Sequence, residues 1–239
     1  MTWPTVPWNQ APTVSSAALR QADQQASSRF GIEPIQLMEV AGWQIASFID
    51  RFVDGIRGKR VTVVAGSGNN GGDALVAARF LHQRGAIVRA SIVPARDPNS
   101  LAERQALTLG RLGIPMVEAP HGVDAPADVL VDGLFGIGVR LPLRDPALRI
   151  IAVMNASHAP IVAIDVPSGL DADSGAGQEG AVRAAATITL VAPKPALRGN
   201  PNVGRVFVAD IGMPSGVFST EGDAVARLYQ IGDLVELTN

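Results

Sequence analysis

Polar residues suited to binding or acid–base chemistry gather in four short segments of the 239-residue chain. Each segment directly follows a run of apolar, mostly β-branched residues that is typical of a buried strand. Ligands of open parallel sheets bind beyond the carboxyl ends of the strands, so the four segments are predicted to face one crevice. The segments are Gly66–Asp73, Asp132–Pro142, Ile164–Gly175 and Val191–Ala196.

The first segment reads Gly-Ser-Gly-Asn-Asn-Gly-Gly-Asp over residues 66–73. Glycines can take positive φ values and let a backbone approach a ligand closely. We expect a helix to begin at Asp73, with free N–H groups that point toward the loop and favour an anion. The segment is therefore predicted to cradle a nucleotide phosphate-type ligand. The alternative is a tight turn in which Gly and Asn serve conformation alone.

The glycines of this segment also fit the Gly-x-Gly-x-x-Gly spacing of dinucleotide-binding proteins. However, the next predicted strand ends in Val93-Pro-Ala-Arg96, without the acidic residue that holds a ribose in those proteins. The chain also lacks an acid–base set for hydride transfer. An ordinary NAD-dependent oxidoreductase is therefore not favoured.

Asp165 is the strongest acid–base candidate of the four segments. It closes a predicted strand and precedes the rigid turn Pro167-Ser-Gly169. When the Cβ of an aspartate is buried and its carboxyl group faces an open crevice, the pKa of the carboxyl can be raised for proton transfer. We interpret Asp171 and Asp173 as solvated turn residues.

Asp132 and Lys194 are weaker candidates when each is taken alone. An Asp after a strand is common turn chemistry, and a single lysine is usually on the surface. Lys194, however, lies between two prolines at a strand end, which restrict its backbone.

The composition indicates an ordinary globular protein, with 47% apolar and 18% charged residues. A net charge of −2 gives no electrostatic reason to expect nucleic acid or an acidic membrane surface as a partner. No run approaches the about 20 apolar residues that a membrane helix needs. The first residues do not resemble a secretory signal, so we expect a cytoplasmic location.

Strands alternate with helices along most of the chain, which predicts an α/β fold with a mostly parallel, doubly wound sheet. One domain over 1–239 is the simplest account, with 1–14 as a loosely ordered arm and two helices as an N-terminal addition. Trp3 and Trp8 in the arm could alternatively dock on a second subunit. Helices are predicted at 15–30, 35–52, 73–85, 101–112 and 146–157, and strands at 60–65, 86–93, 115–118, 127–132, 160–166, 186–192 and, last, 205–209.

The four segments in this order resemble the NAD(P)H-hydrate epimerase family, also called the YjeF N-terminal domain. The family's motifs match at 66–74, 132–138, 165–169 and 193–194, and a helix segment matches at 37–42. The resemblance runs from about Ser15 to Met213. It implies a Rossmann-like three-layer α/β/α sandwich, usually a homodimer. It also implies interconversion of the R and S forms of hydrated NADH or NADPH, so that a dehydratase on a separate chain can repair the whole pool.

The resemblance also implies roles for individual residues. Asn70, Asp132 and Ser168 would hold a potassium ion. The residue types agree, since three oxygen donors with one carboxylate suit a monovalent ion better than Mg²⁺ or Ca²⁺. The scattered histidines and the absence of cysteine give no case for zinc. The hydrate would be contacted by Asn69, Asn70, Gly71, Gly72, Asp73, Gly136, Ile137, Gly138, Val139, Arg140, Leu141, Pro142 and Asp165.

Epimerisation of such a hydrate requires a proton shuttle at the ring hydroxyl and no redox partner. The hydroxyl is lost, or the ring opens, and the group is re-added on the other face. Our hypothesis is that Asp165 is the acid–base group and that Lys194 tunes it or steadies a phosphate. Asp132 is the alternative acid–base group.

The chain departs from the family pattern at a few positions. Ala74 and Leu75 replace a usual Gly and a frequent aromatic residue, Ile137 replaces a common Thr, and Ala196 replaces a common Gly. A catalytically weak nucleotide-binding or partner-scaffold module of the same fold is therefore the alternative function.

Overall fold

The computed structural model describes residues 3–95 and 97–239. Within these residues nine strands form one sheet in the order β1-β9-β8-β7-β6-β5-β2-β3-β4. Neighbouring strands are parallel except for the antiparallel pair β8–β9. The strands are β1 Thr5–Pro7, β2 Arg60–Ala65, β3 Ile87–Ile92, β4 Met116–Glu118, β5 Val129–Gly133, β6 Ile161–Ile164, β7 Ala186–Leu190, β8 Arg205–Ala209 and β9 Leu234–Thr238.

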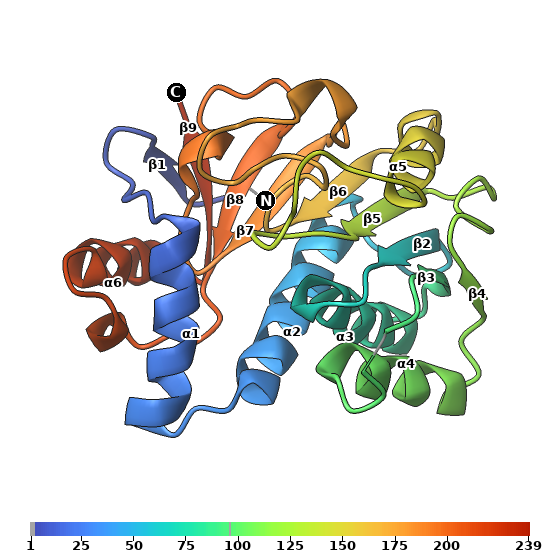
Figure 1. Ribbon diagram of the computed structural model, residues 1–239, viewed down its shortest axis with the longest axis horizontal. Coiled ribbons are helices and arrows are strands. Elements are labelled where there is room, and N and C mark those ends of the chain that lie inside the picture. Colours follow the sequence, from blue (N-terminus) through green and yellow to red (C-terminus); the bar gives the residue numbers. More distant parts are fainter. Residues whose placement is uncertain (1–2, 96) are drawn as a thin grey trace.

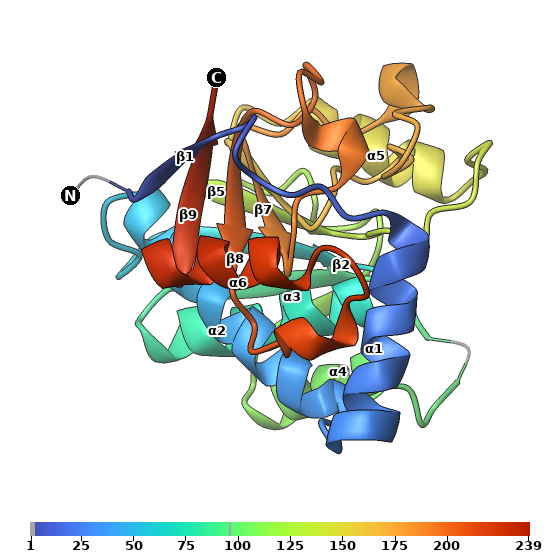
Figure 2. The same ribbon diagram turned by 90° about the vertical axis from the view of Figure 1, so that its left-hand side faces the viewer.

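Helices cover both faces of this sheet, which confirms the predicted three-layer α/β arrangement (Figure 1). Figure 2 shows α5 on the opposite side of the sheet from α1, α2, α3 and α4. The helices are α1 Ser16–Phe30, α2 Pro34–Phe52, α3 Asn69–Gln83, α4 Leu101–Arg111, α5 Ala147–Asn155 and α6 Gly222–Ile231, with short 3₁₀ turns at η1 Gln178–Gly180, η2 Pro195–Leu197 and η3 Ser215–Val217.

The central strands are apolar on both faces because each face is covered. Val63 and Val131 belong to the core under α1, α2 and α3, whereas Val64 and Leu130 pack with Met154 of α5 on the other side. Successive residues of a strand point to opposite faces, so a strand buried on both faces needs apolar residues at both parities.

The strand order changes direction at β2. Strands β3 and β4 lie on one side of β2, and β5, β6 and β7 lie on the other. Where the connections from two neighbouring parallel strands run to opposite sides, a crevice opens at the carboxyl ends of those strands. The segments after β2, β5, β6 and β7 therefore meet there, as predicted.

Helix α3 begins four residues earlier than predicted, at Asn69 instead of Asp73. The predicted loop is thus a short turn followed by the first turn of a helix. None of its glycines has a positive φ. They allow close packing instead: a Cβ on Gly71 would lie 1.8 Å from the Gly66 carbonyl oxygen, and one on Gly72 would lie 2.4 Å from the Met38 methyl carbon.

The prediction of a loosely ordered N-terminal arm is wrong for the residues that the structure describes, and Met1 and Thr2 lie outside them. Strand β1 pairs with β9, and Trp8 is buried. The Trp3 ring packs on Phe48 and Phe207, with ring centroids 5.5 and 5.1 Å away. Both tryptophans therefore pack within their own chain.

Strand β8 is also not the last element, because α6 and β9 follow it. The end of the chain folds back and places β9 between β8 and β1. Local periodicity does not reveal such a pairing, since its partners lie at opposite ends of the sequence. In contrast, the predicted start and end of α1 are confirmed: Ser15 caps the helix, and Gly31 ends it with φ 67°.

Candidate active site

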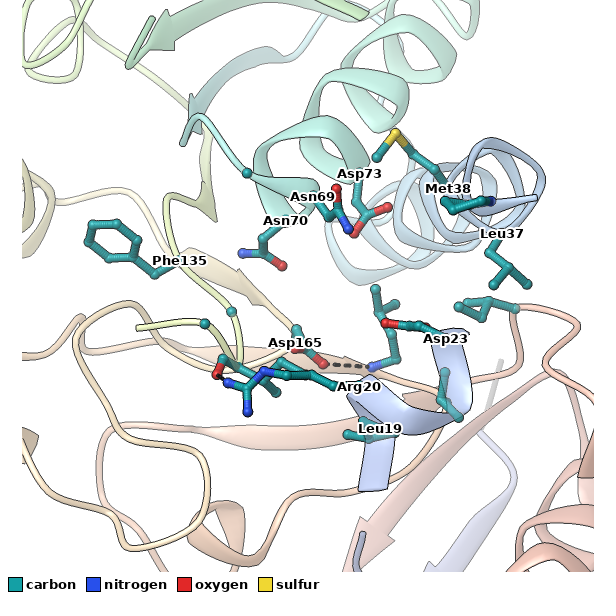
Figure 3. A pocket seen from close by; sticks show the side chains of 18 of the residues that line it. Leu19, Arg20, Asp23, Leu37, Met38, Asn69, Asn70, Asp73, Phe135 and Asp165 are labelled. Carbon is teal, nitrogen blue, oxygen red and sulfur yellow. Dashed lines mark hydrogen bonds between the residues drawn. The ribbon is translucent and has the colours of Figure 1, made fainter. Parts of the chain in front are cut away.

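A cavity of about 490 Å³ lies at the carboxyl ends of β2, β5, β6 and β7. Its walls come from α1, α2, the first turn of α3 and the segments that follow the four strands (Figure 3). Its ionisable lining side chains, among the described residues, are Arg20, Asp23, Asp73, Asp165 and Lys194. The cavity thus brings carboxyl and ammonium groups together from four separate parts of the chain.

Asp165 and Lys194 form a buried ion pair at the base of this cavity. Lys194 is only 1% exposed and Asp165 only 8%. The Lys194 ammonium donates to Asp165 Oδ1, to the Thr189 hydroxyl at 2.9 Å and to the Leu190 carbonyl oxygen at 2.8 Å. Since an ammonium has three donors, all of them are satisfied. Lys194 is therefore a buried anchor and not a surface lysine.

The backbone beside this pair is held in an uncommon conformation. Asp165 has φ 69° and Val191 has φ 68°. A positive φ costs a β-branched residue about 1–3 kcal/mol and persists only where the surroundings enforce it. Val191 donates its N–H to Ala209, and its carbonyl accepts a hydrogen bond from the Tyr229 hydroxyl. Such strain is typical of functional sites.

Asp132 lies below the cavity and does not line it. Its carboxylate accepts hydrogen bonds from the Ser168 hydroxyl at 2.6 Å, the Ser168 N–H at 2.8 Å and the Leu134 N–H at 3.2 Å. Burial raises the pKa of Asp132 to about 6, and these hydrogen bonds oppose the rise. The Ser168 hydroxyl in turn accepts from the Phe135 N–H at 2.8 Å. The pair therefore braces the segment after β5.

The first turn of α3 presents Asn69, Asn70 and Asp73 to the cavity. Asp73 is 8% exposed, and burial, together with the nearby carboxylates of Asp165 and Asp23, holds its pKa well above the ordinary value. The side-chain nitrogen of Asn70 is buried and has no hydrogen-bond partner among the described residues. Gly71 and Gly72 do not line the cavity and serve the packing described above.

The residues after β5 that were predicted to contact substrate, 136–142, do not all line the same cavity. Gly136, Ile137 and Gly138 line the cavity, but Val139 and Arg140 do not. Leu141 and Pro142 line a second hollow beside residues 175–180. A Cβ on Gly136 would lie 3.0 Å from Asp165 Oδ2 and 3.2 Å from Asn70 Oδ1, so this glycine lets the backbone pass between two site residues.

The sequence reasoning missed the contribution of α1. Leu19, Arg20 and Asp23 line the cavity, and Arg20 Nη2 donates to the Ile137 carbonyl oxygen at 2.6 Å. Burial and the Asp165 carboxylate raise the pKa of Asp23, while Lys194 lowers it. The sequence did contain a signal for this contribution. Arg20 and Asp23 lie next to the buried stripe of α1, which includes Leu19.

The two remaining aspartates of the third segment behave differently from each other. Asp171 forms a local turn by accepting from the Ser174 N–H and hydroxyl at 2.8 and 2.7 Å, as predicted. Asp173 is exposed, but its carboxylate also accepts from the Ser16 N–H at 2.9 Å. It therefore helps to fix the start of α1.

Within residues 3–95 and 97–239, no group of three or more His, Cys, Asp or Glu side chains is arranged to hold a metal ion. A site built from amide and hydroxyl oxygens is a different case. None of the helices in this part of the chain has the length and apolar character of a membrane span.

The fold and cavity define a Rossmann-like α/β protein with a pocket lined by carboxyl and ammonium groups at the switch point of its sheet. A family model described as YjeF-related protein N-terminus matches residues 34–196. The chain is 36% identical over 201 residues to the NAD(P)H-hydrate epimerase of Limosilactobacillus fermentum, covering 82% of this chain and 95% of that protein. The chain therefore belongs to the YjeF-related protein N-terminus family.

Longer relatives share the same region. The bifunctional NAD(P)H-hydrate repair enzymes Nnr of Salinibacter ruber and Archaeoglobus fulgidus are 36% and 40% identical to the chain over 224 and 188 residues. These matches cover 85% and 77% of this chain but only 41% and 38% of those proteins. The crystal structure of the yeast protein ynu0, YNL200c, superposes with a TM-score of 0.71 at 28% identity, over 83% of this chain and 88% of that one.

Proposed function

We propose that this protein interconverts the R and S forms of hydrated NADH and NADPH. The observation that carries the proposal is the buried Asp165–Lys194 pair, which faces a cavity at the switch point of the sheet. The name and near-complete coverage of the Limosilactobacillus relative support the same activity.

In this proposal the nucleotide lies along the first turn of α3. The free N–H groups of that turn and the side chains of Asn69 and Asn70 are suited to phosphate and ribose oxygens. The backbone of Gly136–Gly138 closes the cavity from the other side. The ring end of the substrate then lies over Asp165.

The chemistry follows from the hemiaminal nature of the hydrated carbon, which bears a hydroxyl next to the ring nitrogen. Inversion requires a proton to move to and from an oxygen, by loss and re-addition of water or by ring opening. Asp165 performs this transfer, and Lys194 holds its carboxylate in place. No electron donor or acceptor takes part.

A potassium ion bound by Asn70, Asp132 and Ser168 belongs to the same proposal. The donor set suits a monovalent cation because it contains one carboxylate. The Asn70 side chain fits this role, because its buried amide nitrogen has no hydrogen-bond partner in the described part of the chain. Rotating the amide by 180° would place its oxygen at that position, free to bind a cation. When bound, the ion would supply a fixed positive charge that orders these side chains beneath the cavity.

The departures from the family pattern do not block the cavity. The methyl group of Ala74 packs against Gly133, because a Cβ added to Gly133 would lie 2.4 Å from the Ala74 Cβ. Ala74 is fully buried and does not line the cavity. Ile137 contributes its carbonyl oxygen to Arg20 while its side chain packs on the core. Neither observation favours a catalytically inactive module.

The partners proposed for this protein are a second copy of the chain and a dehydratase. The dehydratase consumes one epimer, so the epimerase makes the other epimer available to it. A homodimer, a dehydratase on a separate chain and a cytoplasmic location all stay predictions.

The test mixes the protein with both epimers and a strictly stereospecific dehydratase. Faster clearance of the R form supports the epimerase. Binding of the hydrate without faster clearance supports a binding module, and oxidation of a co-substrate supports an oxidoreductase.

A further inference from the structure

Asp23 belongs to the wall of the cavity although α1 lies outside the residues that the family model matches. Three contacts fix α1 in that position. Asp173 holds its N-terminus, its apolar stripe is buried, and Arg20 donates to Ile137. Asp23 therefore occupies a defined place and is not part of a loose appendage.

The Asp23 carboxyl has no hydrogen-bond or ion-pair partner among the described residues, whereas the nearby cations are engaged. Lys194 uses its three donors on Asp165, Thr189 and Leu190, and Arg20 donates to Ile137. Figure 3 shows the side chains of Asp23, Asp73 and Asp165 around one space. Three carboxyl groups from three elements thus surround the space in which the substrate ring is proposed to lie.

We propose that Asp23 is a second acid–base residue of this site, which protonates the departing ring hydroxyl while Asp165 deprotonates the water that adds to the other face. The inference rests on the proposed epimerase function and deepens it. It selects the route through loss and re-addition of water over ring opening.

The step balances in atoms and electrons. The C–O bond breaks as the Asp23 proton moves to the hydroxyl oxygen, water leaves, and the ring-nitrogen lone pair forms a C=N bond. Water then adds to the opposite face, the C=N pair returns to nitrogen, and the proton of the incoming water goes to Asp165. One water leaves and one enters. Asp23, which is exposed, regains its proton from solvent, and Asp165 releases the proton that it accepted through the open cavity, so the site returns to its starting state. The roles exchange in the reverse direction.

The charge balance of the cavity suits this route. The intermediate carries a positive charge on the ring, and preorganised carboxylates stabilise such a charge where it develops. Asp23 is suited to be the donor because partial loss of hydration where its carboxyl lines the cavity, together with the Asp165 carboxylate, raises its pKa, against the opposing effect of Lys194. Asp165, ion-paired with Lys194, is suited to be the acceptor. Asp73 and Arg20 are the other ionisable groups that line the cavity with Asp23, Asp165 and Lys194.

The experiment follows inversion of one pure epimer in ¹⁸O-labelled water, with the wild type and with Asp23→Asn, Asp23→Glu, Asp73→Asn and Gln24→Ala. Gln24 lies on the same helix but does not line the cavity, so it is the matched control. We expect Asp23→Asn to lower kcat by about 100-fold, with KM little changed and one limb of the pH–rate profile lost. We expect Asp23→Glu to retain most activity, Gln24→Ala to match the wild type, and each inversion by the wild type to incorporate one labelled oxygen.

The inference would be overturned by inversion without label, by a wild-type rate for Asp23→Asn, or by loss of the pH limb in Asp73→Asn while Asp23→Asn keeps it. A rise in KM alone for Asp23→Asn also contradicts it, because that change marks a binding role. If the wild type does not interconvert the epimers at all, the proposed function itself fails and the inference falls with it. An active wild type beside Asp23→Asn at the wild-type rate refutes the inference alone and leaves the proposed function standing.

Discussion

Lys194 donates a hydrogen bond to Asp165 in a pair that is almost fully buried, and the lysine's other two donors are taken by Thr189 and Leu190. The pair places a carboxylate at the base of a cavity and gives it one direct cationic partner. Its position at the carboxyl ends of β6 and β7 follows from the topology of the sheet.

Replacing Lys194 by Met should destabilise the protein by about 3–5 kcal/mol, because it leaves the buried Asp165 carboxylate unpaired. Urea unfolding measures the change. The double variant Lys194→Met/Asp165→Asn should recover part of the loss, since it removes the stranded charge. The control is Arg60→Met, which breaks an exposed ion pair with Asp128 and should change stability little. An equal loss in both single variants would contradict the prediction.

Replacing Asp73 by Asn should stabilise the protein at neutral pH. The folded-state pKa of Asp73 lies well above its ordinary value of 3.8, so the native state binds the extra proton between those two pKa values. Wild-type stability therefore falls as pH rises through this window, and the destabilisation is fully present above the raised pKa. Urea midpoints between acidic and neutral pH should show the fall in the wild type and a smaller one in Asp73→Asn.

Asp128 provides a control of opposite sign. Its pKa is lowered to about 2, first by the hydrogen bond from the Arg60 side chain. The stability that it contributes is present above its ordinary pKa and is lost as pH falls toward 2. Asp128→Asn should therefore change only the acidic end of the curve, and only slightly because its ion pair with Arg60 is exposed. The same pH dependence in both variants would contradict the assignment for Asp73.

Gly136→Ala should damage the site because its Cβ would lie 3.0 Å from Asp165 Oδ2 and 3.2 Å from Asn70 Oδ1. We expect weaker binding of the hydrate and a lower rate, with little loss of fold stability. Gly138→Ala is the matched control, since a Cβ there meets nothing within 4 Å. Titration of both variants with the hydrated cofactor measures the difference, and equal affinities would refute the crowding argument.

Tyr229→Phe should lower activity from a distance. The Tyr229 hydroxyl donates to the carbonyl of Val191, whose φ is 68° and whose side chain lines the cavity. Losing one such hydrogen bond costs about 1 kcal/mol and should relax the strained turn before Lys194. Thr108→Val removes a hydroxyl that bonds only within α4 and is the control. Unchanged kcat in Tyr229→Phe with a folded protein would refute a positioning role.

The sequence predicted the central sheet well because its strands are marked locally. The run 60–65 is apolar at both parities, and β2 occupies those residues. Asp165 and Lys194 were placed correctly at strand ends because strand ends meet at one edge of a parallel sheet.

The features that the sequence did not predict depend on contacts distant in the chain. Asp23 lies on α1, and only the packing of that helix across the cavity brings it near Asp165. Strand β9 depends on pairing with β8 and β1. The start of α3 was misplaced because Gly71 and Gly72 have low helix propensity, and their need for close packing is visible only in three dimensions.

The rate at which Asp165→Asn inverts one pure epimer of the hydrated cofactor tests the role of Asp165 most directly. We expect the wild type to interconvert the epimers and Asp165→Asn to be slower by about 100-fold or more while it still binds the hydrate. Epimerisation by Asp165→Asn at the wild-type rate would rule out Asp165 as the acid–base group.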